Sequence, residues 1–337
     1  MSTQKQQHYI PKCYSRNFAN SEGYIFVRDT WTGKGFHSKP SNVLRQNYLY
    51  TQPVHAENRF DNALENFFSN AVESDWPSIV AAIIRKEDLT GDQWQQLIEF
   101  MLSIRVRVPN TLKAVTAVLK ERVQQESQKI PADGLLLDLF MKIRPEFRGT
   151  PSIGDLINEG IISTTIDPHR PLISMEKLIR SNRAILSIRG QPKFLHNRTS
   201  ENFISSDNPF VSHIYKRKIE EITPYSYDRL ENIEIVFPIS SNTALMINTR
   251  KKDNKQHYDV TDKDTIRSIN EKISLYADRY VFCADAKNLE TVKGYSEKCP
   301  VPVRNSAIMD ADGIVHDICF QFGRPLDQAN NWKYDFE

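Results

Sequence analysis

A histidine and a proline stand close together near the start of the chain, in the stretch QQHYIPKCYSRNF at residues 6–18. His8 precedes Pro11, whose ring fixes the backbone angle φ and stiffens the segment. A histidine held in this way can bind a metal ion or act as a general base near neutral pH. The alternative is that it only bonds to nearby backbone groups. We take His8 as a candidate catalytic residue, with Pro11 supporting it.

Carboxylates at helical spacing form a second candidate site, in the stretch AENRFDNALENFFSNAVES. Glu57, Asp61 and Glu65 recur every four residues, which predicts one shared helix face, and Glu73 follows farther along. Stacked carboxylates can bind a divalent cation such as Mg²⁺ or Mn²⁺. The alternative is a solvated face opposite the phenylalanines. Glu65 is the predicted metal ligand and Glu73 a supporting residue.

Two arginines precede a predicted helix kink in the segment IRVRVP, which ends at Pro109. Arg105 and Arg107 could neutralise a phosphate through paired hydrogen bonds. They could equally pair with the carboxylates of the preceding helix. The residue types leave both alternatives open.

Small polar residues gather at the end of a predicted strand in FISSDNPF, residues 203–210. Ser206, Asp207 and Asn208 stand before a proline, at a strand end where catalytic groups often lie. The alternative is a turn in which the aspartate or asparagine bonds to nearby backbone. The density of polar groups favours a functional role, which His213 could share.

The composition is that of a globular protein and excludes few functions. The 337 residues are 39% hydrophobic and carry a net charge of +2, which neither demands nor excludes a nucleic-acid partner. The four cysteines show no C-x-x-C spacing, which is typical of a reducing compartment. The polar N-terminus and the absence of a long apolar run predict a cytoplasmic protein with no membrane partner. Common nucleotide-loop, dinucleotide and serine-hydrolase motifs are missing.

The elements that must position these residues follow from the periodicity. A hairpin is predicted near residues 23–40, helices over about 56–182, and a mostly antiparallel β region with one helix after that. A capped helix is expected to begin after Thr90. This order predicts an α+β fold. We expect one domain over residues 1–290, with a hairpin and tail at 291–337 packed on it.

These motifs, in this order, resemble the domain-of-unknown-function 4238 family. The matching residues are the H-x-x-P segment with its R-N-F end, Glu65 and Glu73, the R-x-P segment at Arg107, S-D-N-P at 206–209 and P-I-S at 238–240. The resemblance covers about residues 7–284. It implies no activity, but it rests on polar residues far apart in sequence rather than on a core pattern.

A histidine, carboxylates and an arginine are the materials of a hydrolytic site. The leading hypothesis is a metal-dependent nuclease that acts as a defence or toxin-type effector. Asp207 and Glu65 would hold the cation, His8 would be the base or a third ligand, and Arg107 would stabilise phosphate charge.

Two alternatives remain. One is a binding module in which these polar residues form a structural network, with a protein partner or a second copy of the chain. The other is a metal-free RNA-cleaving effector that uses His8 and Arg107. Convergence on an open cleft would favour catalysis, and side chains sealed by partners would favour the network.

Overall fold

The computed structural model describes residues 6–47, 49, 52–54, 59–61, 66–164, 191–215, 233–248, 255–290, 304–309 and 315–321. The chain forms two compact units: Met1–Asn110 with Met175–Glu337, and Thr111–Ser174. The predicted boundary at residue 290 stays a prediction. No helix among the described residues is long and apolar enough to cross a membrane.

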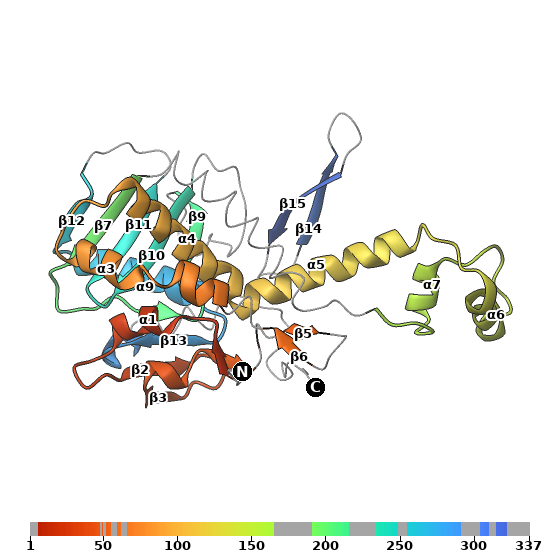
Figure 1. The fold of residues 1–337 in the computed structure, drawn as a ribbon, viewed down its shortest axis with the longest axis horizontal. Helices are drawn as coiled ribbons and strands as arrows, with labels where there is room; N and C mark the ends of the chain where they lie inside the picture. Colours follow the sequence, from red (N-terminus) through yellow and green to blue (C-terminus); the bar gives the residue numbers. More distant parts are fainter. Residues whose placement is uncertain are drawn as a thin grey trace. The chain divides into compact units, whose positions relative to one another are not determined.

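A five-stranded sheet is the centre of the first unit (Figure 1). Its strand order is β12-β7-β11-β10-β9, and every pairing is antiparallel except that of β12 with β7. The strands are β7 (Gln191–Asn197), β9 (Val211–Ile214), β10 (Ile233–Ser240), β11 (Thr243–Asn248) and β12 (His257–Val260).

A second, four-stranded antiparallel sheet has the order β3-β2-β13-β8. Its strands are β2 (Ile25–Asp29), β3 (Gly35–Ser38), β8 (Ser205–Ser206) and β13 (Tyr280–Cys283). Three separate strand pairs complete the described β structure: β1 (Gln6–His8) with β4 (Arg45–Asn47), β5 (Gln52–Val54) with β6 (Arg59–Asp61), and β14 (Arg304–Met309) with β15 (Val315–Gln321).

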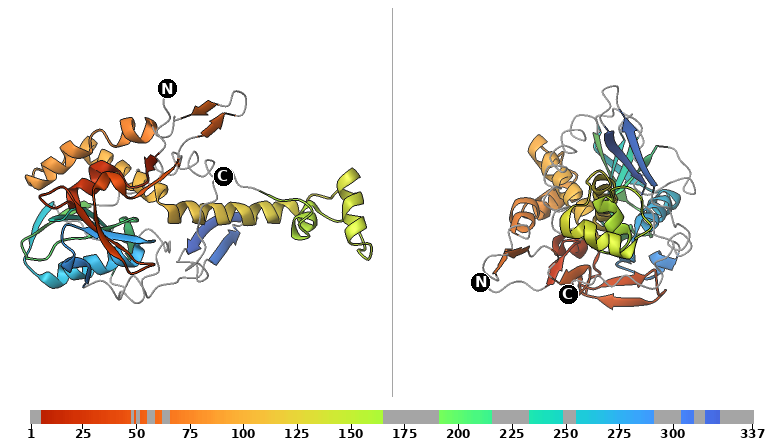
Figure 2. Two further views of the ribbon diagram at one scale, coloured as in Figure 1. Left: turned by 90° about the horizontal axis from the view of Figure 1, so that it is seen from below. Right: turned by 90° about the vertical axis from the view of Figure 1, so that its right-hand side faces the viewer.

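Helices cover both faces of the five-stranded sheet, as Figures 1 and 2 show. On one face lie α3 (Trp76–Ile84) and α4 (Gly91–Arg107). Trp76 stacks on Phe100 with ring centroids 3.9 Å apart and meets Phe237 of β10 edge-on. On the other face lies α9 (Lys263–Tyr276), whose isoleucines pack with Val211, Val236 and the strand β13. Alternating residues of each strand therefore face two different helix layers.

The N-terminal segment folds into α1 (Lys12–Ser15) and a short 3₁₀ turn, η1 (Arg16–Phe18). Tyr14 and Phe18 are fully buried, and their rings contact Phe237 and Phe282 respectively. The start of the chain is thus part of the core of this unit.

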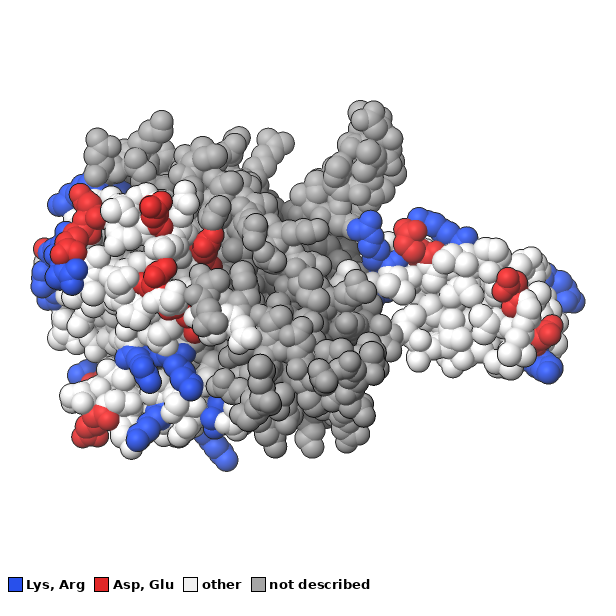
Figure 3. All heavy atoms as spheres, viewed as in Figure 1, with Lys and Arg blue, Asp and Glu red and all other residues white. Residues whose placement is uncertain are grey.

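The second unit is helical. It contains most of α5 (Pro109–Ser127), together with α6 (Gly134–Ile143) and α7 (Ile153–Asn158). Ala132, Phe140 and Leu156 form its small core, and Ser152 caps α7 through a reciprocal hydrogen-bond pair with Asp155. On the face that Figure 3 shows, the described part of this unit carries both acidic and basic side chains.

The α+β fold with its N-terminal hairpin, helical middle and mostly antiparallel C-terminal sheet is confirmed. The helix after Thr90 begins with the expected cap, because the Thr90 hydroxyl accepts from the Gln93 amide and the Gln93 side chain bonds back. The helix predicted from residue 56 is wrong at its start, since Arg59–Asp61 pairs with β5. Pairing between strands satisfies the backbone groups there, so Asp61 lies on a strand and not on a helix face with Glu65.

The backbone conformation changes again after this strand. The chain turns into a π-helix, η3 (Phe67–Val72), just before α3. The last part of the predicted helical region, residues 165–182, lies outside the described residues.

Candidate functional site

The carboxylate of Asp207 is bound on both oxygens by backbone amides. Oδ1 accepts from the amide of Asp278 at 2.8 Å, and Oδ2 accepts from the amides of Arg279 and Tyr280 at 2.7 and 2.8 Å. The side chain of Asp207 is almost wholly buried, at 2% exposure. These bonds join the end of β8 to the turn between α9 and β13.

Asn208 and Ser206 add hydrogen bonds to the same connection. The Asn208 amide side chain donates to the carbonyl of Tyr276 at 2.8 Å, and its backbone N–H donates to the Ser206 hydroxyl at 3.1 Å. Burial and the charge of Asp278 raise the pKa of Asp207 to about 7, against the opposite influence of the three amide bonds. The S-D-N segment therefore holds the end of α9 and the start of β13 in place.

The N-terminal motif is tied to the same region by buried hydrogen bonds. The hydroxyl of Tyr14 bonds to the Ser205 hydroxyl and donates to the carbonyl of Pro238, both at 2.8 Å. The side chain of Asn17 donates to the carbonyl of Ile239 at 3.1 Å. The R-N-F, S-D-N-P and P-I-S motifs, which lie far apart in sequence, therefore meet in one structural cluster.

Arg107 is buried at the end of α4 and is already paired. Its Nη1 lies 2.7 Å from Oε1 of Glu73, and its other nitrogens donate to the carbonyl and hydroxyl of Ser103 at 3.2 Å. Its guanidinium lies 4.4 Å from the centre of the Phe68 ring. The sequence left open whether Arg107 meets a phosphate or a carboxylate, and in the structure it contacts the carboxylate.

The thiol of Cys13 extends this ion pair toward the N-terminal segment. Its sulfur lies 4.0 Å from Oε2 of Glu73. Burial and the negative charge of Glu73 raise the pKa of Cys13 to about 12, so the thiol keeps its proton. Cys13 therefore acts as a weak donor to Glu73 and not as a nucleophile.

His8 lies on β1 opposite Arg45 of β4 and bonds to backbone groups of Ser41 and Val43. Burial and the nearby charges of Lys12 and Arg45 lower its pKa to about 4. The imidazole is therefore neutral at physiological pH and only a weak base. Pro11, its predicted support, caps the start of α1 and accepts from the amides of Tyr14 and Ser15.

The three predicted catalytic side chains are thus held by three different sets of partners. Glu65, the predicted second metal ligand, lies outside the described residues. Among the residues that are described, no three His, Cys, Asp or Glu side chains come together as a metal site requires. His213 pairs with Glu234 of β10 at 3.2 Å, and Lys272 reaches the same carboxylate at 2.9 Å.

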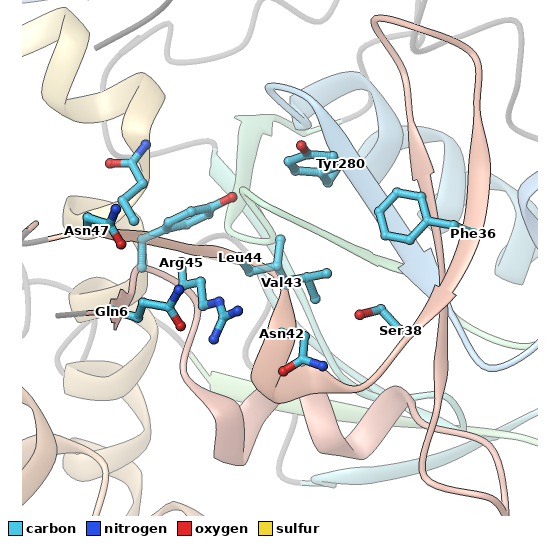
Figure 4. A pocket seen from close by; sticks show the side chains of 11 residues that line it. Gln6, Phe36, Ser38, Asn42, Val43, Leu44, Arg45, Asn47 and Tyr280 are labelled. Carbon is cyan, nitrogen blue, oxygen red and sulfur yellow. The ribbon is translucent and has the colours of Figure 1, made fainter. Parts of the chain in front are cut away.

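A pocket of about 440 Å³ lies in the first unit, beside the strand that carries His8 (Figure 4). Eleven residues line it: Gln6, Tyr9, Phe36, Ser38, Asn42, Val43, Leu44, Arg45, Gln46, Asn47 and Tyr280. They come from β1 and the residue after it, β3, the η2 turn (Pro40–Asn42) with the segment after it, β4, and the start of β13. A volume of this size is typical of small-molecule sites.

The lining combines aromatic rings, amide side chains and one positive charge. Phe36 and Tyr280 stand on one side, and Arg45, Gln6 and Asn47 on the other, as Figure 4 shows. Arg45 is the charged residue among the lining residues, and no carboxylate is among them. The pocket is therefore suited to a polar ligand that carries negative charge.

Backbone strain and a fixed ring shape this pocket. Leu44 has a φ of 59°, which a residue with a side chain rarely adopts, and its carbonyl accepts from the amides of Tyr9 and Ile10. Tyr280 packs against the guanidinium of Arg279, which is fixed by two hydrogen bonds to Oδ2 of Asp29 at 2.8 and 3.1 Å. Strained residues of this kind cluster at functional sites.

Sequence reasoning missed this pocket. Its residues are single aromatic, amide and arginine side chains at scattered positions, and no spacing rule connects residue 280 to residues 6–47. The one available signal was the amide content of the segment NVLRQN at residues 42–47, which ends with β4.

Comparison with known proteins gives a family and no activity. The family model described as "Protein of unknown function (DUF4238)" matches residues 6–287. The match contains the pocket and the motif cluster, and it ends before the strand pair β14–β15. No curated protein and no solved structure matches the chain.

Proposed function

The chain belongs to the DUF4238 family, and from the geometry of the site we propose that it is a binding protein. It takes a small polar ligand with negative charge in the pocket between β1–β4 and Tyr280. Asp207 holds the fold beside this pocket through the backbone amide of Tyr280, and Arg107 holds it through Glu73 and Ser103. The observation that carries the proposal is a contrast: both of these side chains are sealed by partners, while Arg45 lines an open pocket.

The charge of the lining supports this ligand class. Arginine stays protonated in proteins and offers a planar set of donors that fits carboxylates and phosphates. Among the described residues Arg45 makes no salt bridge, and no carboxylate lines the pocket with it. An anionic ligand would supply the partner. The exposed side chains of Gln6, Phe36, Asn42 and Asn47 show that the pocket opens to solvent.

A thermal-shift experiment tests this proposal. Pyrophosphate, citrate, a hexose phosphate and a mononucleotide are each added to the wild type, to Arg45→Gln and to Lys34→Gln. Lys34 is an exposed cation on the neighbouring hairpin and does not line the pocket, so it is the matched control. We expect at least one anion to raise the melting temperature of the wild type and of Lys34→Gln but not of Arg45→Gln. Equal shifts in Arg45→Gln, or none with any anion, would contradict the proposal.

The nuclease and defence-effector hypothesis, its divalent cation, and the cytoplasmic location stay predictions. The decisive assay is cleavage of plasmid DNA and total RNA with Mg²⁺, Mn²⁺ or EDTA, by the wild type and by Asp207→Asn. From the contacts of Asp207 we expect no metal-dependent cleavage. Metal-dependent cleavage that disappears in a folded Asp207→Asn protein would restore the enzymatic hypothesis.

A further inference from the structure

The pocket has two chemically different sides, and this difference narrows the ligand class. The rings of Phe36 and Tyr280 face a side where Arg45 and amide groups gather (Figure 4). Planar ligands stack on such rings, and phosphates pair with arginine. A ligand that satisfies both sides needs a flat polar group and a negative group a short distance apart.

Building on the proposed function, we propose that this ligand is a nucleotide unit. Its base would lie against Phe36 and Tyr280, and its phosphate would lie at Arg45. Asparagine and glutamine side chains carry a donor and an acceptor together, as the edges of bases do. Gln6, Asn42, Gln46 and Asn47 bring four such groups to the lining.

The aromatic side is prepared for stacking before any ligand arrives. The guanidinium of Arg279 lies 4.9 Å from the centre of the Tyr280 ring, and Asp29 holds that guanidinium by two hydrogen bonds. Arg279 is not among the lining residues, so it supports the ring from outside the pocket. Phe36 is 41% exposed, so its ring is accessible to a ligand.

Tyr9 also lines the pocket. Burial, followed by the negative charge of Asp207, raises the pKa of Tyr9 well above its usual value, so the hydroxyl keeps its proton. The buried residue Asp207 therefore lies close to the pocket. Its carboxylate also fixes the backbone of Tyr280, whose amide donates a hydrogen bond to it. The motif cluster acts as the support of the binding wall.

The ligand could be a free mononucleotide or one residue of a single-stranded nucleic acid, because both present the same base and phosphate. Titration calorimetry with the four ribonucleoside monophosphates tests the first source. Fluorescence anisotropy with short labelled single-stranded RNA and DNA tests the second. Ribose 5-phosphate, which lacks the base, and adenosine, which lacks the phosphate, are the matched ligand controls.

Substitutions at Phe36 and Arg45 separate the contributions of the ring and of the charge to binding. We expect Phe36→Ala to weaken nucleotide binding about tenfold and to leave ribose 5-phosphate binding unchanged. We expect Arg45→Gln to weaken both about tenfold, with adenosine unaffected. Lys34→Gln, which removes a nearby exposed cation outside the pocket, should bind as the wild type does. Circular dichroism verifies that each variant is folded.

The outcomes distinguish the two proposals. Binding of mononucleotides or of single strands, weakened by both variants, supports the nucleotide inference and identifies its source. If ribose 5-phosphate or pyrophosphate binds as tightly as a nucleotide and Phe36→Ala has no effect, the nucleotide inference fails while the anion pocket stands. If no anion binds and Arg45→Gln changes nothing, both proposals fail.

Discussion

Two polar regions of the same unit differ in how their side chains are satisfied. Asp207 in the motif cluster and Arg107 at the end of α4 are 2% and 1% exposed, and both are held by hydrogen bonds. In the pocket, Arg45 and the amide side chains stand at an open surface. Buried polar groups with complete partners stabilise a fold, whereas exposed groups in a concavity can exchange water for a ligand. Residues typical of catalysis can therefore be scaffold, and undistinguished residues can form the site.

The largest effect on stability is expected when the carboxylate of Asp207 is removed, which tests whether the motif cluster is structural. Asp207→Ala leaves three buried backbone amides without their acceptor, so we expect the free energy of unfolding to fall by about 3–5 kcal/mol. Guanidinium denaturation measures this change. Glu22→Ala, at an exposed position of the same unit, should change it by less than about 0.5 kcal/mol. A small loss in Asp207→Ala would show that the cluster is not scaffold.

The ion pair of Arg107 and Glu73 should have the next largest effect. Arg107→Met keeps the packing on Phe68 but removes the positively charged partner of the Glu73 carboxylate. Because Glu73 is 23% exposed and can reach water, we expect a loss of about 2–3 kcal/mol. A double-mutant cycle with Glu73→Gln measures the coupling between the two side chains. A coupling energy near zero would contradict a structural role for the pair.

The pH dependence of the free energy of unfolding tests how His8, on the strand beside the pocket, is held. Its pKa is lowered to about 4 in the folded protein, below the unfolded value of about 6.5, so the unfolded chain binds more protons between these values. The contribution of His8 is complete above pH 6.5 and is lost as the pH falls toward 4. With a discount for its partial exposure, we expect about 1–2 kcal/mol.

Comparison of the wild type with His8→Asn isolates this contribution. Asp207, whose pKa is raised to about 7, acts with the opposite sign, because the folded state holds its proton longer. Only the difference between the two proteins reports on His8. Urea denaturation at several pH values from 4 to 7 should show a difference that grows with pH. A constant difference would contradict the shifted pKa.

The smallest effect on stability is expected in the pocket. Arg45→Gln should change the free energy of unfolding by less than about 0.5 kcal/mol, because its side chain makes no salt bridge among the described residues. Chemical denaturation of the ligand-free protein measures this. A loss above about 1 kcal/mol would mean that Arg45 also belongs to the scaffold, and the distinction between the two regions would disappear.

Local patterns were enough to predict much of the fold. The cap at Thr90, the isoleucine periodicity of α9 and the hairpin of β2 and β3 depend on residues close in sequence, so they can be identified without tertiary information. The helix predicted from residue 56 is wrong at residues 59–61 because a short apolar pattern does not distinguish a helix from a strand that pairs elsewhere. The motifs also identified the family correctly.

The sequence by itself determined the α+β class, the family and the polar residues that matter to the fold. Only the tertiary structure decided their roles. The acceptors of Asp207 bind amides some seventy residues away, and Arg107 meets Glu73 across two helices. The pocket likewise joins residues 6–47 to Tyr280. Local sequence sets backbone propensity, whereas burial and long-range hydrogen bonds decide whether a polar side chain is a structural link or a free binding group.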